Sequence, residues 1–214
     1  EIMNSVTPIT SLSDTLLSMV EDKDEEISHG LQTISTTGKG LLAFVESYRK
    51  FTRIPTPEPS LFYLKAFIER MVELARHQNP CDHITFHTKI DPADLILHAD
   101  ENLISQVVIN LLKNAAEASP DGGQITLSAS SDDCNHIMLS VSDTGNGMTP
   151  EQQAHIFEPF VSYKTGGTGL GLAIVQSIVS AHHGHLSVKS LPGSGSSFCI
   201  LLPIPLSPVE KSAQ

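Results

Sequence analysis

The sequence predicts an α+β protein, in which two long helices precede a mixed unit of helices and mostly antiparallel strands. Three observations support this class. Apolar residues recur at helical spacing before residue 50, prolines interrupt residues 55–59, and alternating stretches that suit strands follow between further helical stretches. We therefore expect a helical hairpin at residues 1–54, a linker at 55–60, the mixed unit at 61–205 and a tail at 206–214.

The hairpin is predicted from two apolar seams. Residues 2–20 and 27–48 each carry apolar side chains at alternating spacings of four and three. The acidic run 21–26 suits a solvated turn, and its acids favour the start of the second helix. Gly38 interrupts the second seam and indicates a close backbone approach or a local bend. Two helices alone cannot bury such seams, so we expect a homodimer built on a four-helix bundle.

The mixed unit is predicted from periodicity and turn residues. Helices are expected at 61–77, 101–118, near Pro150 and at 170–181, and strands at 84–90, 95–99, 124–130, 136–142, 185–190 and 197–202. Gly184 is interpreted as the C-cap of the last helix, with His182 and His183 near the negative end of its dipole.

Composition excludes several classes of function. The 214 residues include 13 basic and 24 acidic side chains, a net charge of −11 that opposes binding to nucleic acid or to an anionic membrane. No apolar run approaches the roughly 18 residues of a membrane span. The three cysteines form no C-x-x-C pair, which suits a reducing compartment. We expect a cytoplasmic segment with no nucleic-acid partner and no membrane contact.

Two asparagines share one face of the helix predicted at 101–118. Asn110 and Asn114 lie four residues apart, with Lys113 and Glu117 nearby. An amide oxygen can bind Mg²⁺ without adding negative charge beside phosphates. Taken alone, the pair also suits an ordinary solvent-facing helix surface.

A carboxylate follows the strand predicted at 136–142. In Asp143-Thr144-Gly145-Asn146-Gly147, the carboxylate can accept a hydrogen bond from an exocyclic amine, and two glycines let the backbone turn beneath a ligand. A simple turn at the end of a strand would carry the same residues.

A glycine-rich segment at 166–172 opens the helix at 170–181. Backbone amides at a helix start, unobstructed by side chains, can hold phosphate. The order of residues fits neither a Walker loop nor a Rossmann fingerprint. Lys164 supplies a mobile cation for a terminal phosphate, and Phe157-Glu158-Pro159-Phe160 suits a lid anchored by aromatic rings.

Together, these four segments resemble the four boxes of sensor histidine kinase ATP-binding domains, in the order typical of that family. The resemblance covers about residues 59–203 and implies the Bergerat-type ATP-binding sandwich shared with gyrase, Hsp90 and MutL proteins. It also implies that Asn114 binds Mg²⁺, Asn110 assists phosphate and metal geometry, and Asp143 recognises adenine. The ATP-binding set that we expect is Asn110, Lys113, Asn114, Asp143, Gly145, Gly147, Phe160, Lys164, Thr168, Gly169, Leu170 and Gly171.

The first residues resemble the segment that follows the phosphoacceptor histidine in a divergent H box, with the pattern His-Glu-Ile-Met-Asn. The histidine would then directly precede Glu1. Glu1 would act as the adjacent acid or base, and Asn4, one turn on, would orient a water for dephosphorylation of a partner. Glu1, Asn4 and Lys164 are the expected catalytic residues, and Pro8 is expected to kink the helix.

The resemblance implies a kinase core that binds Mg-ATP, phosphorylates its own histidine and passes the phosphoryl group to a response-regulator aspartate, with phosphatase activity toward the same partner. Gyrase- and Hsp90-like ATPases place a glutamate base where Asn110 stands, which favours phosphotransfer here. Two alternatives stay open: a dimeric scaffold that binds ATP without transfer, and a Bergerat-type ATPase.

Overall fold

The structure is a computed structural model that describes residues 2–19, 25–78, 84–119, 122–132, 135–164 and 167–204. Its elements follow in this order: α1 (Ile2–Met19), α2 (Glu25–Thr52), β1 (Ser60–Tyr63), α3 (Leu64–Gln78), β2 (Thr85–Asp91), β3 (Ile96–Ala99), α4 (Glu101–Ala118), β4 (Gln124–Ser131), β5 (His136–Asp143), α5 (Pro150–His155), α6 (Gly171–Ala181), β6 (His185–Ser190) and β7 (Ser196–Pro203). The predicted α+β class is confirmed.

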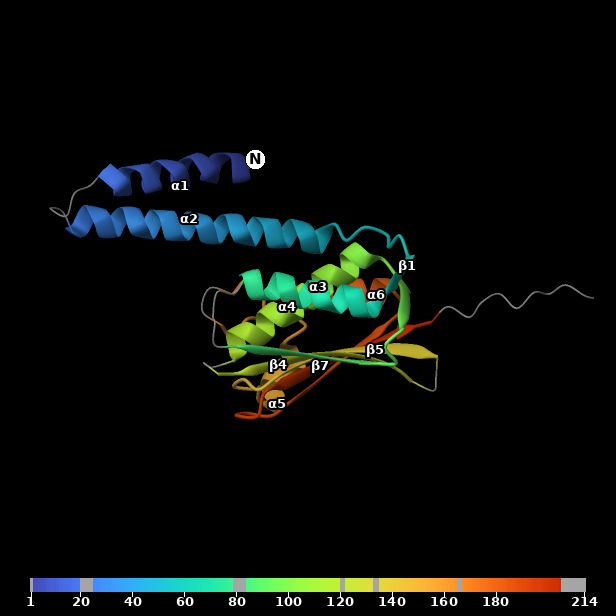
Figure 1. Ribbon diagram of the computed structural model, residues 1–214. Coiled ribbons are helices and arrows are strands. Elements are labelled where there is room, and N and C mark those ends of the chain that lie inside the picture. The colour runs from blue at the N-terminus through green and yellow to red at the C-terminus, as the bar shows by residue number, and fades with distance from the viewer. Residues whose placement is uncertain are drawn as a thin grey trace, which may run out of the picture.

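Helices α1 and α2 lie side by side and run in opposite directions (Figure 1). Polar contacts join them across the pair. The hydroxyl of Ser13 donates to the carbonyl of Leu31 at 3.0 Å, and that of Ser35 donates to the carboxylate of Asp14 at 2.6 Å. These bonds fix the register of one helix along the other.

Gly38 lies where α1 and α2 approach each other closely. A Cβ atom at this position would lie 2.3 Å from Cγ2 of Thr10, so the predicted close approach is confirmed. Helix α1 continues through Pro8 without ending there. Residues 21–24 of the predicted acidic run lie outside the described residues, and Glu25 and Glu26 are the first residues of α2.

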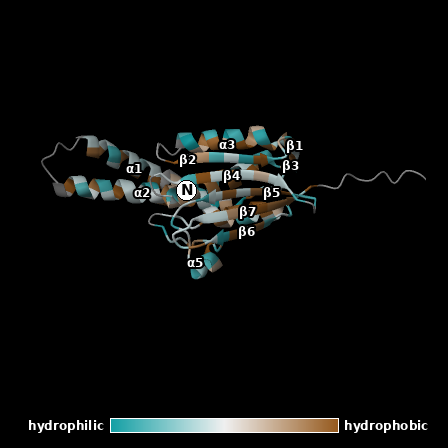
Figure 2. Ribbon diagram, turned by 60° about the horizontal axis from the view of Figure 1, so that its bottom comes forward, coloured by the Kyte–Doolittle hydropathy of each residue, from teal (hydrophilic) through white to brown (hydrophobic). Residues whose placement is uncertain are grey.

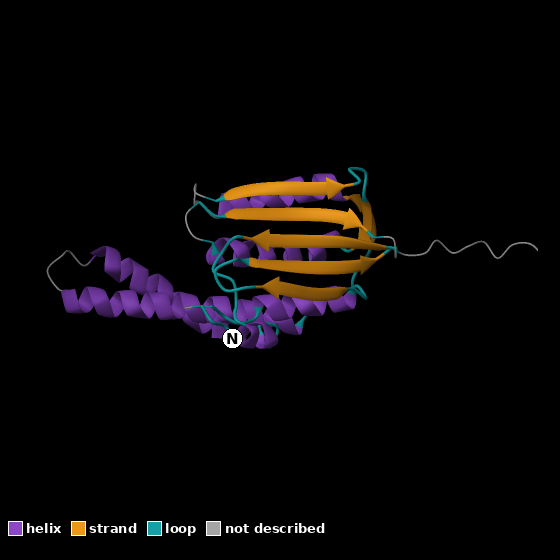
Figure 3. Cartoon of the chain, turned by 90° about the horizontal axis from the view of Figure 1, so that it is seen from below, coloured by secondary structure: helices purple, strands orange, loops and turns teal. Residues whose placement is uncertain are grey.

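The strands form two sheets. The larger sheet has the order β2-β4-β5-β7-β6, in which β2 and β4 are parallel and the other pairs are antiparallel (Figure 3). Strands β1 and β3 form a separate antiparallel pair. The expectation of mostly antiparallel strands is therefore confirmed.

One boundary was predicted wrongly. The helix expected at 61–77 begins at Leu64, because residues 60–63 form β1, whose Ser60 pairs with Ala99 and whose Tyr63 pairs with Ile96. The segment Leu-Phe-Tyr has aromatic side chains that suit a strand, and a partner strand more than thirty residues away decides between the two states.

The core lies between the larger sheet and helices α3, α4 and α6, which cover one face of that sheet (Figures 1 and 3). Strands β4, β5 and β7 turn alternate side chains toward these helices, and those side chains are buried. Serines are frequent on the opposite face, where the hydroxyl of Ser197 lies 2.8 Å from that of Ser142. This alternation is typical of an antiparallel sheet with one covered face.

The end of α6 differs from the prediction. His183, not Gly184, has the left-handed backbone conformation, with φ of 57°. Gly184 instead passes close to β7, since a Cβ atom there would lie 2.7 Å from the carbonyl oxygen of Leu201. The glycine is thus required by a tertiary approach rather than by helix capping.

Within the described ranges, no helix combines the length and the apolar character that a membrane crossing requires.

Candidate functional site

Helix α4 holds the two asparagines on its partly exposed face. Asp100 caps the helix, and its Oδ1 accepts hydrogen bonds from the backbone of Asn102 at 3.0 Å and of Leu103 at 3.1 Å. The opposite side of α4 is buried in the core. A fixed helix start and one buried side together set the direction in which Asn110 and Asn114 face.

Asn110 joins α4 to the start of α6. Its Nδ2 donates to the backbone carbonyl of Gly171 at 3.4 Å. A Cβ atom at Gly171 would have no atom within 4 Å, so the space beside the start of α6 is open. The predicted asparagine and the predicted glycine loop, 61 residues apart, therefore meet.

The N-terminus of α6 lacks a side-chain cap. Within the described residues, no side chain caps α6 at Leu170, whereas Asp100 caps α4 and Thr149 caps α5. The first backbone N–H groups of a helix have no partner inside the helix, and they carry the positive end of its dipole. An uncapped start beside open space is a suitable site for an anion such as phosphate.

Lys164 reaches the polar face of α4. Its Nζ donates to Oε2 of Glu117 at 2.8 Å and to the backbone carbonyl of Asn114 at 3.3 Å. Nζ of Lys113 lies 3.9 Å from the other carboxylate oxygen of Glu117. Both lysines predicted from the sequence thus share one carboxylate, and both side chains remain partly exposed.

Asp143 ends β5 and is 8% exposed. Its Oδ1 accepts hydrogen bonds from the backbone of Gly145 at 2.8 Å and of Ser196 at 3.2 Å. Burial raises the pKa of the Asp143 carboxyl, although the two N–H donors and the charge of Lys164 act in the opposite direction. Because both donors use Oδ1, Oδ2 is the oxygen that can accept from a ligand.

The two glycines after Asp143, Gly145 and Gly147, lie so close to other backbone atoms that a side chain would not fit. A Cβ atom at Gly145 would lie 2.4 Å from the carbonyl oxygen of Ala118, at the end of α4. Gly147 has φ of 64°, and a Cβ atom there would lie 1.9 Å from the carbonyl oxygen of Leu191. The turn therefore fits tightly between the end of α4 and the turn that joins β6 to β7.

Phe160 connects the predicted lid with the glycine loop and with α2. Its backbone N–H donates to the carbonyl of Gly169 at 3.0 Å. Both residues have positive φ, 68° for Phe160 and 67° for Gly169. The ring of Phe160 lies 6.0 Å from the ring of Phe44 and 6.5 Å from that of Tyr48, both on α2. The base of the lid is thus fixed to the loop that precedes α6.

The remaining predicted site residues differ in how far they are exposed to a ligand. Leu170 is fully buried in the core, so only its backbone can face a ligand, whereas Thr168 is half-buried. Phe157 packs edge-on against Phe198, with ring centroids 6.5 Å apart. Glu1 and the side chain of Asn4 lie outside what the structure describes.

A metal site made by protein side chains alone is not present in the described part of the chain, because no three His, Cys, Asp or Glu residues gather there. An amide oxygen on α4 together with phosphate oxygens would still suit Mg²⁺, which keeps several ligands from water and substrate. The half-buried amides of Asn110 and Asn114 fit this role.

Sequence reasoning missed Ser196. Its backbone N–H holds the carboxylate of Asp143, although the two residues are 53 positions apart. No local pattern marks this residue, because the contact depends on β7 lying next to β5. The order of strands in the sheet was therefore needed to find it.

Comparison with known proteins identifies the family. Residues 99–206 match the model described as histidine kinase-, DNA gyrase B- and HSP90-like ATPase. The signal transduction histidine-protein kinase AtoS of Escherichia coli is 31% identical over 206 residues, which cover 95% of this chain and 33% of AtoS. The chain thus corresponds to about a third of that relative.

Two solved structures share the fold along nearly the whole chain. Full-length ShkA in complex with AMPPNP has a TM-score of 0.73 and 28% identity, covering 96% of this chain and 45% of ShkA. Histidine kinase ThkA in complex with the response regulator protein TrrA has a TM-score of 0.72 and 25% identity, covering 96% of this chain and 59% of the matched chain. The chain belongs to the histidine kinase-, DNA gyrase B- and HSP90-like ATPases and, within them, to the sensor histidine kinases.

Proposed function

We propose that this chain is the core of a sensor histidine kinase, which binds Mg-ATP, phosphorylates a histidine on its helical hairpin and passes the phosphoryl group to a response-regulator aspartate. The observation that carries the proposal is the uncapped start of α6, which lies in open space beside Asn110. ShkA, a neighbour in fold, was solved with the ATP analogue AMPPNP.

In this proposal the nucleotide extends from Asp143 to the start of α6. Oδ2 of Asp143 accepts a hydrogen bond from the exocyclic amine of adenine, and the N–H groups at Gly169 and Gly171 hold phosphate oxygens. Asn114 would hold Mg²⁺ with help from Asn110, and the metal would supply positive charge that neutralises the phosphates. The remaining members of the predicted ATP-binding set would contact the nucleotide between these two ends, Leu170 through its backbone alone.

Without nucleotide, Lys164 forms an ion pair with Glu117, and we expect it to leave this pair when the phosphates bind. The ion pair is partly exposed, at 2.8 Å, so breaking it costs little. A terminal phosphate carries more negative charge than one carboxylate, and it would draw the Nζ group from α4 toward the transferring group. Lys113, at 3.9 Å from the same carboxylate, would then keep Glu117 paired.

The transfer step needs a nucleophile that this chain's ATP site does not provide. An imidazole nitrogen of the histidine proposed to precede Glu1 attacks the γ-phosphorus, the bond to the β–γ bridging oxygen breaks, and ADP leaves. Glu1 fixes the tautomer or accepts the proton. Asn110 has no basic group to activate water, which favours the histidine as acceptor. Asn4 would orient water when the partner aspartyl phosphate is hydrolysed.

The helical hairpin at residues 1–54 is proposed to form a homodimer through a four-helix bundle. Apolar and polar residues alternate along α1 and α2 (Figure 2). Large apolar side chains remain exposed on both helices, and an apolar face of this kind needs a partner. They are Ile9, Leu12, Leu16, Ile27, Ile34 and Leu41.

We propose the remaining domain boundaries as the sequence predicts them: a linker at 55–60, an ATP-binding domain at 61–205 and a tail at 206–214. We propose a cytoplasmic location for this segment and a response-regulator receiver domain as partner. The neighbour ThkA, solved with its response regulator TrrA, supports the class of partner.

The proposal is tested first by calorimetry, with Mg-ATP titrated into the chain. Measurable binding is expected, and its absence would refute the proposal. Next, γ-labelled ATP is added to the protein with its upstream residues. Acid-labile, base-stable label on the protein supports the kinase. Free phosphate without labelled protein would indicate an ATPase, and binding without either product would indicate a scaffold. Asn114→Ala should abolish labelling, and unchanged labelling would show that the metal is held elsewhere.

A further inference from the structure

His182 makes two hydrogen bonds that join α6 to α4. Its Nδ1 lies 2.9 Å from the backbone carbonyl of Ile178, near the end of α6. Its Nε2 lies 3.1 Å from the backbone N–H of Asp100, the residue that caps α4. The imidazole is half-buried between the two helices. It therefore bridges the end of α6 and the beginning of α4.

The partners decide the tautomer of His182. A carbonyl oxygen can only accept, so Nδ1 carries the proton, and a backbone N–H can only donate, so Nε2 carries the lone pair. Both ring nitrogens are used in this single arrangement. An apolar side chain of similar size would leave the N–H of Asp100 without this acceptor.

The other end of the same helix pair lies at the proposed phosphate site. Helices α4 and α6 run in opposite directions, so the start of α6 lies beside Asn110 in the middle of α4. The pair is thus tied at two places, by His182 at one end and by Asn110 with Gly171 at the other. Moving the His182 end would shift the helix start that is proposed to hold phosphate.

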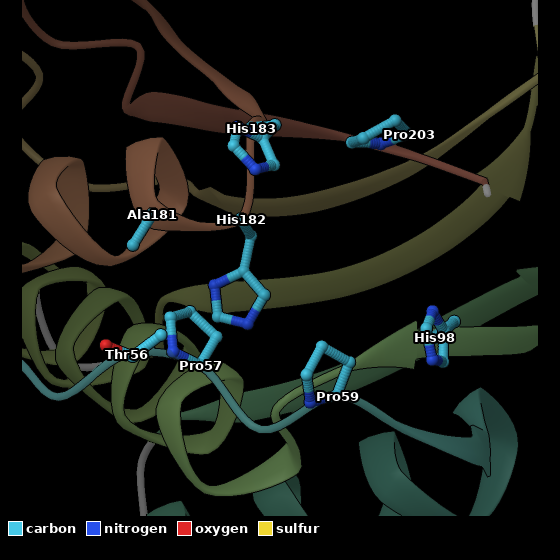
Figure 4. A pocket seen from close by; sticks show the side chains of 8 residues that line it. All are labelled: Thr56, Pro57, Pro59, His98, Ala181, His182, His183 and Pro203. Carbon is cyan, nitrogen blue, oxygen red and sulfur yellow. The ribbon is translucent and has the colours of Figure 1, made fainter.

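Asp100 also binds the linker between the hairpin and the rest of the chain. Its Oδ2 accepts a hydrogen bond from the backbone N–H of Glu58 at 3.0 Å, while Oδ1 caps α4. Beside this bond, linker residues Pro57 and Pro59 face His98 and His182 across a cavity of about 400 Å³ (Figure 4). The hydrogen bond to Asp100 therefore joins Glu58 directly to the residue that caps α4.

We propose that Asp100 and His182 are positioning residues that couple the linker to the ATP site through helices α4 and α6. Asp100 attaches the linker to the start of α4, and His182 attaches the same residue to α6. Nucleotide bound at the start of α6 stabilises the placement of the helix pair and thereby tightens the attachment of Glu58. The coupling rests on the proposed ATP binding, but the attachment does not.

Four variants separate these contacts. Asp100→Asn keeps an acceptor for the α4 cap, since Asn caps a helix as well as Asp does, but places an NH₂ group opposite the N–H of Glu58. His182→Leu removes both ring nitrogens, and His182→Gln returns an acceptor near the N–H of Asp100. His98→Leu, exposed on the same cavity, is the matched control.

The experiment measures amide hydrogen exchange by NMR on the full 214-residue chain, with and without Mg-ATP. Without nucleotide, Asp100→Asn should raise exchange at Glu58 about tenfold, as expected for the loss of one hydrogen bond to a charged acceptor, and leave Asn102 and Leu103 unchanged. Unchanged exchange at Glu58 would overturn the attachment, whether or not ATP binds.

With Mg-ATP, exchange at Glu58 should slow further in the wild type and in His98→Leu. This effect of nucleotide should vanish in His182→Leu and return in His182→Gln. An equal effect in His182→Leu and the wild type would overturn the coupling. Asp100→Asn should also abolish the effect, so this variant decides the result if His182→Leu does not fold. If the wild type binds no ATP, the proposed function fails, and the nucleotide-free comparison still tests the attachment.

Discussion

Asp143→Asn is the substitution for which stability and nucleotide binding should change in opposite directions. Oδ1 of Asp143 accepts from the backbone N–H groups of Gly145 and Ser196, so the asparagine keeps its oxygen there. Its NH₂ group then takes the place of Oδ2. Where the carboxylate would accept from the exocyclic amine of adenine, the variant presents a second donor.

The magnitudes follow from these two changes. A hydrogen bond to a charged acceptor is worth about 1.5–3 kcal/mol, so ATP should bind roughly 10- to 100-fold more weakly.

The effect on stability follows from the pKa of Asp143. Burial raises this pKa, so the carboxyl of the native protein holds its proton to higher pH than that of the unfolded chain. Its contribution to stability is then largest below pH 3.8 and falls as pH rises through the native pKa. At neutral pH the uncharged asparagine should therefore raise the melting temperature.

Calorimetry with ATP and with inosine triphosphate tests the reasoning directly. Inosine carries a carbonyl oxygen in place of the adenine amine, so it should bind the wild type poorly and gain relative to ATP in Asp143→Asn. The exposed Asp94→Asn makes the same change of charge and should alter neither affinity. Equal ATP affinity in Asp143→Asn and the wild type, or an unchanged ratio of the two nucleotides, would show that Oδ2 does not recognise the base.

Three further perturbations follow from the geometry. Gly169→Ala should lower both the melting temperature and the ATP affinity, because φ is 67° and a Cβ atom would lie 2.5 Å from the carbonyl carbon of Phe160. Gly171→Ala, where a Cβ atom has open space, should keep the melting temperature of the wild type. Equal melting temperatures of the two variants would contradict this reasoning. Burial raises the pKa of Asp100, but three backbone N–H donors, including that of Glu58, and the Coulombic interaction with His182 outweigh it, so the pKa is lowered. The stability that the wild type has over Asp100→Asn should therefore be present above pH 3.8 and lost as pH falls through the native pKa. Denaturant titrations of both proteins from pH 3 to 6 check this, and a difference in stability that stays constant with pH would refute it. Glu117→Gln should tighten ATP binding up to about fivefold, because it releases Lys164 from a partly exposed ion pair. Weaker ATP binding of this variant in calorimetry would contradict the proposed transfer of Lys164 from Glu117 to phosphate.

The site residues that could be predicted from the sequence are those brought together by their spacing within one helix or one turn. Asn110 and Asn114 share a helix face because they are one turn apart, and the bounds of α4 agree with the predicted helix at 101–118. The start of α6 differs from the prediction by one residue. Strong periodicity, a capping aspartate and turn residues at the ends determine these elements before any tertiary contact forms.

The errors arose where a distant segment decides the local structure. Residues 61–63 pair with β3 instead of starting a helix, and at the end of α6 His183 takes the left-handed conformation while Gly184 passes close to Leu201. In both places the local sequence suits more than one conformation. Contacts made only in the folded chain then select one of them.

The sequence by itself determined the class of fold, the polar face of α4, the carboxylate after β5 and the glycine loop before α6, because helix and strand periods and turn chemistry act over a few residues. Only the tertiary structure decided which partners these groups have. Ser196 reaches Asp143 across 53 positions, and His182 reaches Asp100 across 82. Such contacts depend on strand order and on the packing of antiparallel helices, which are set when long loops close, and no short-range pattern records that choice.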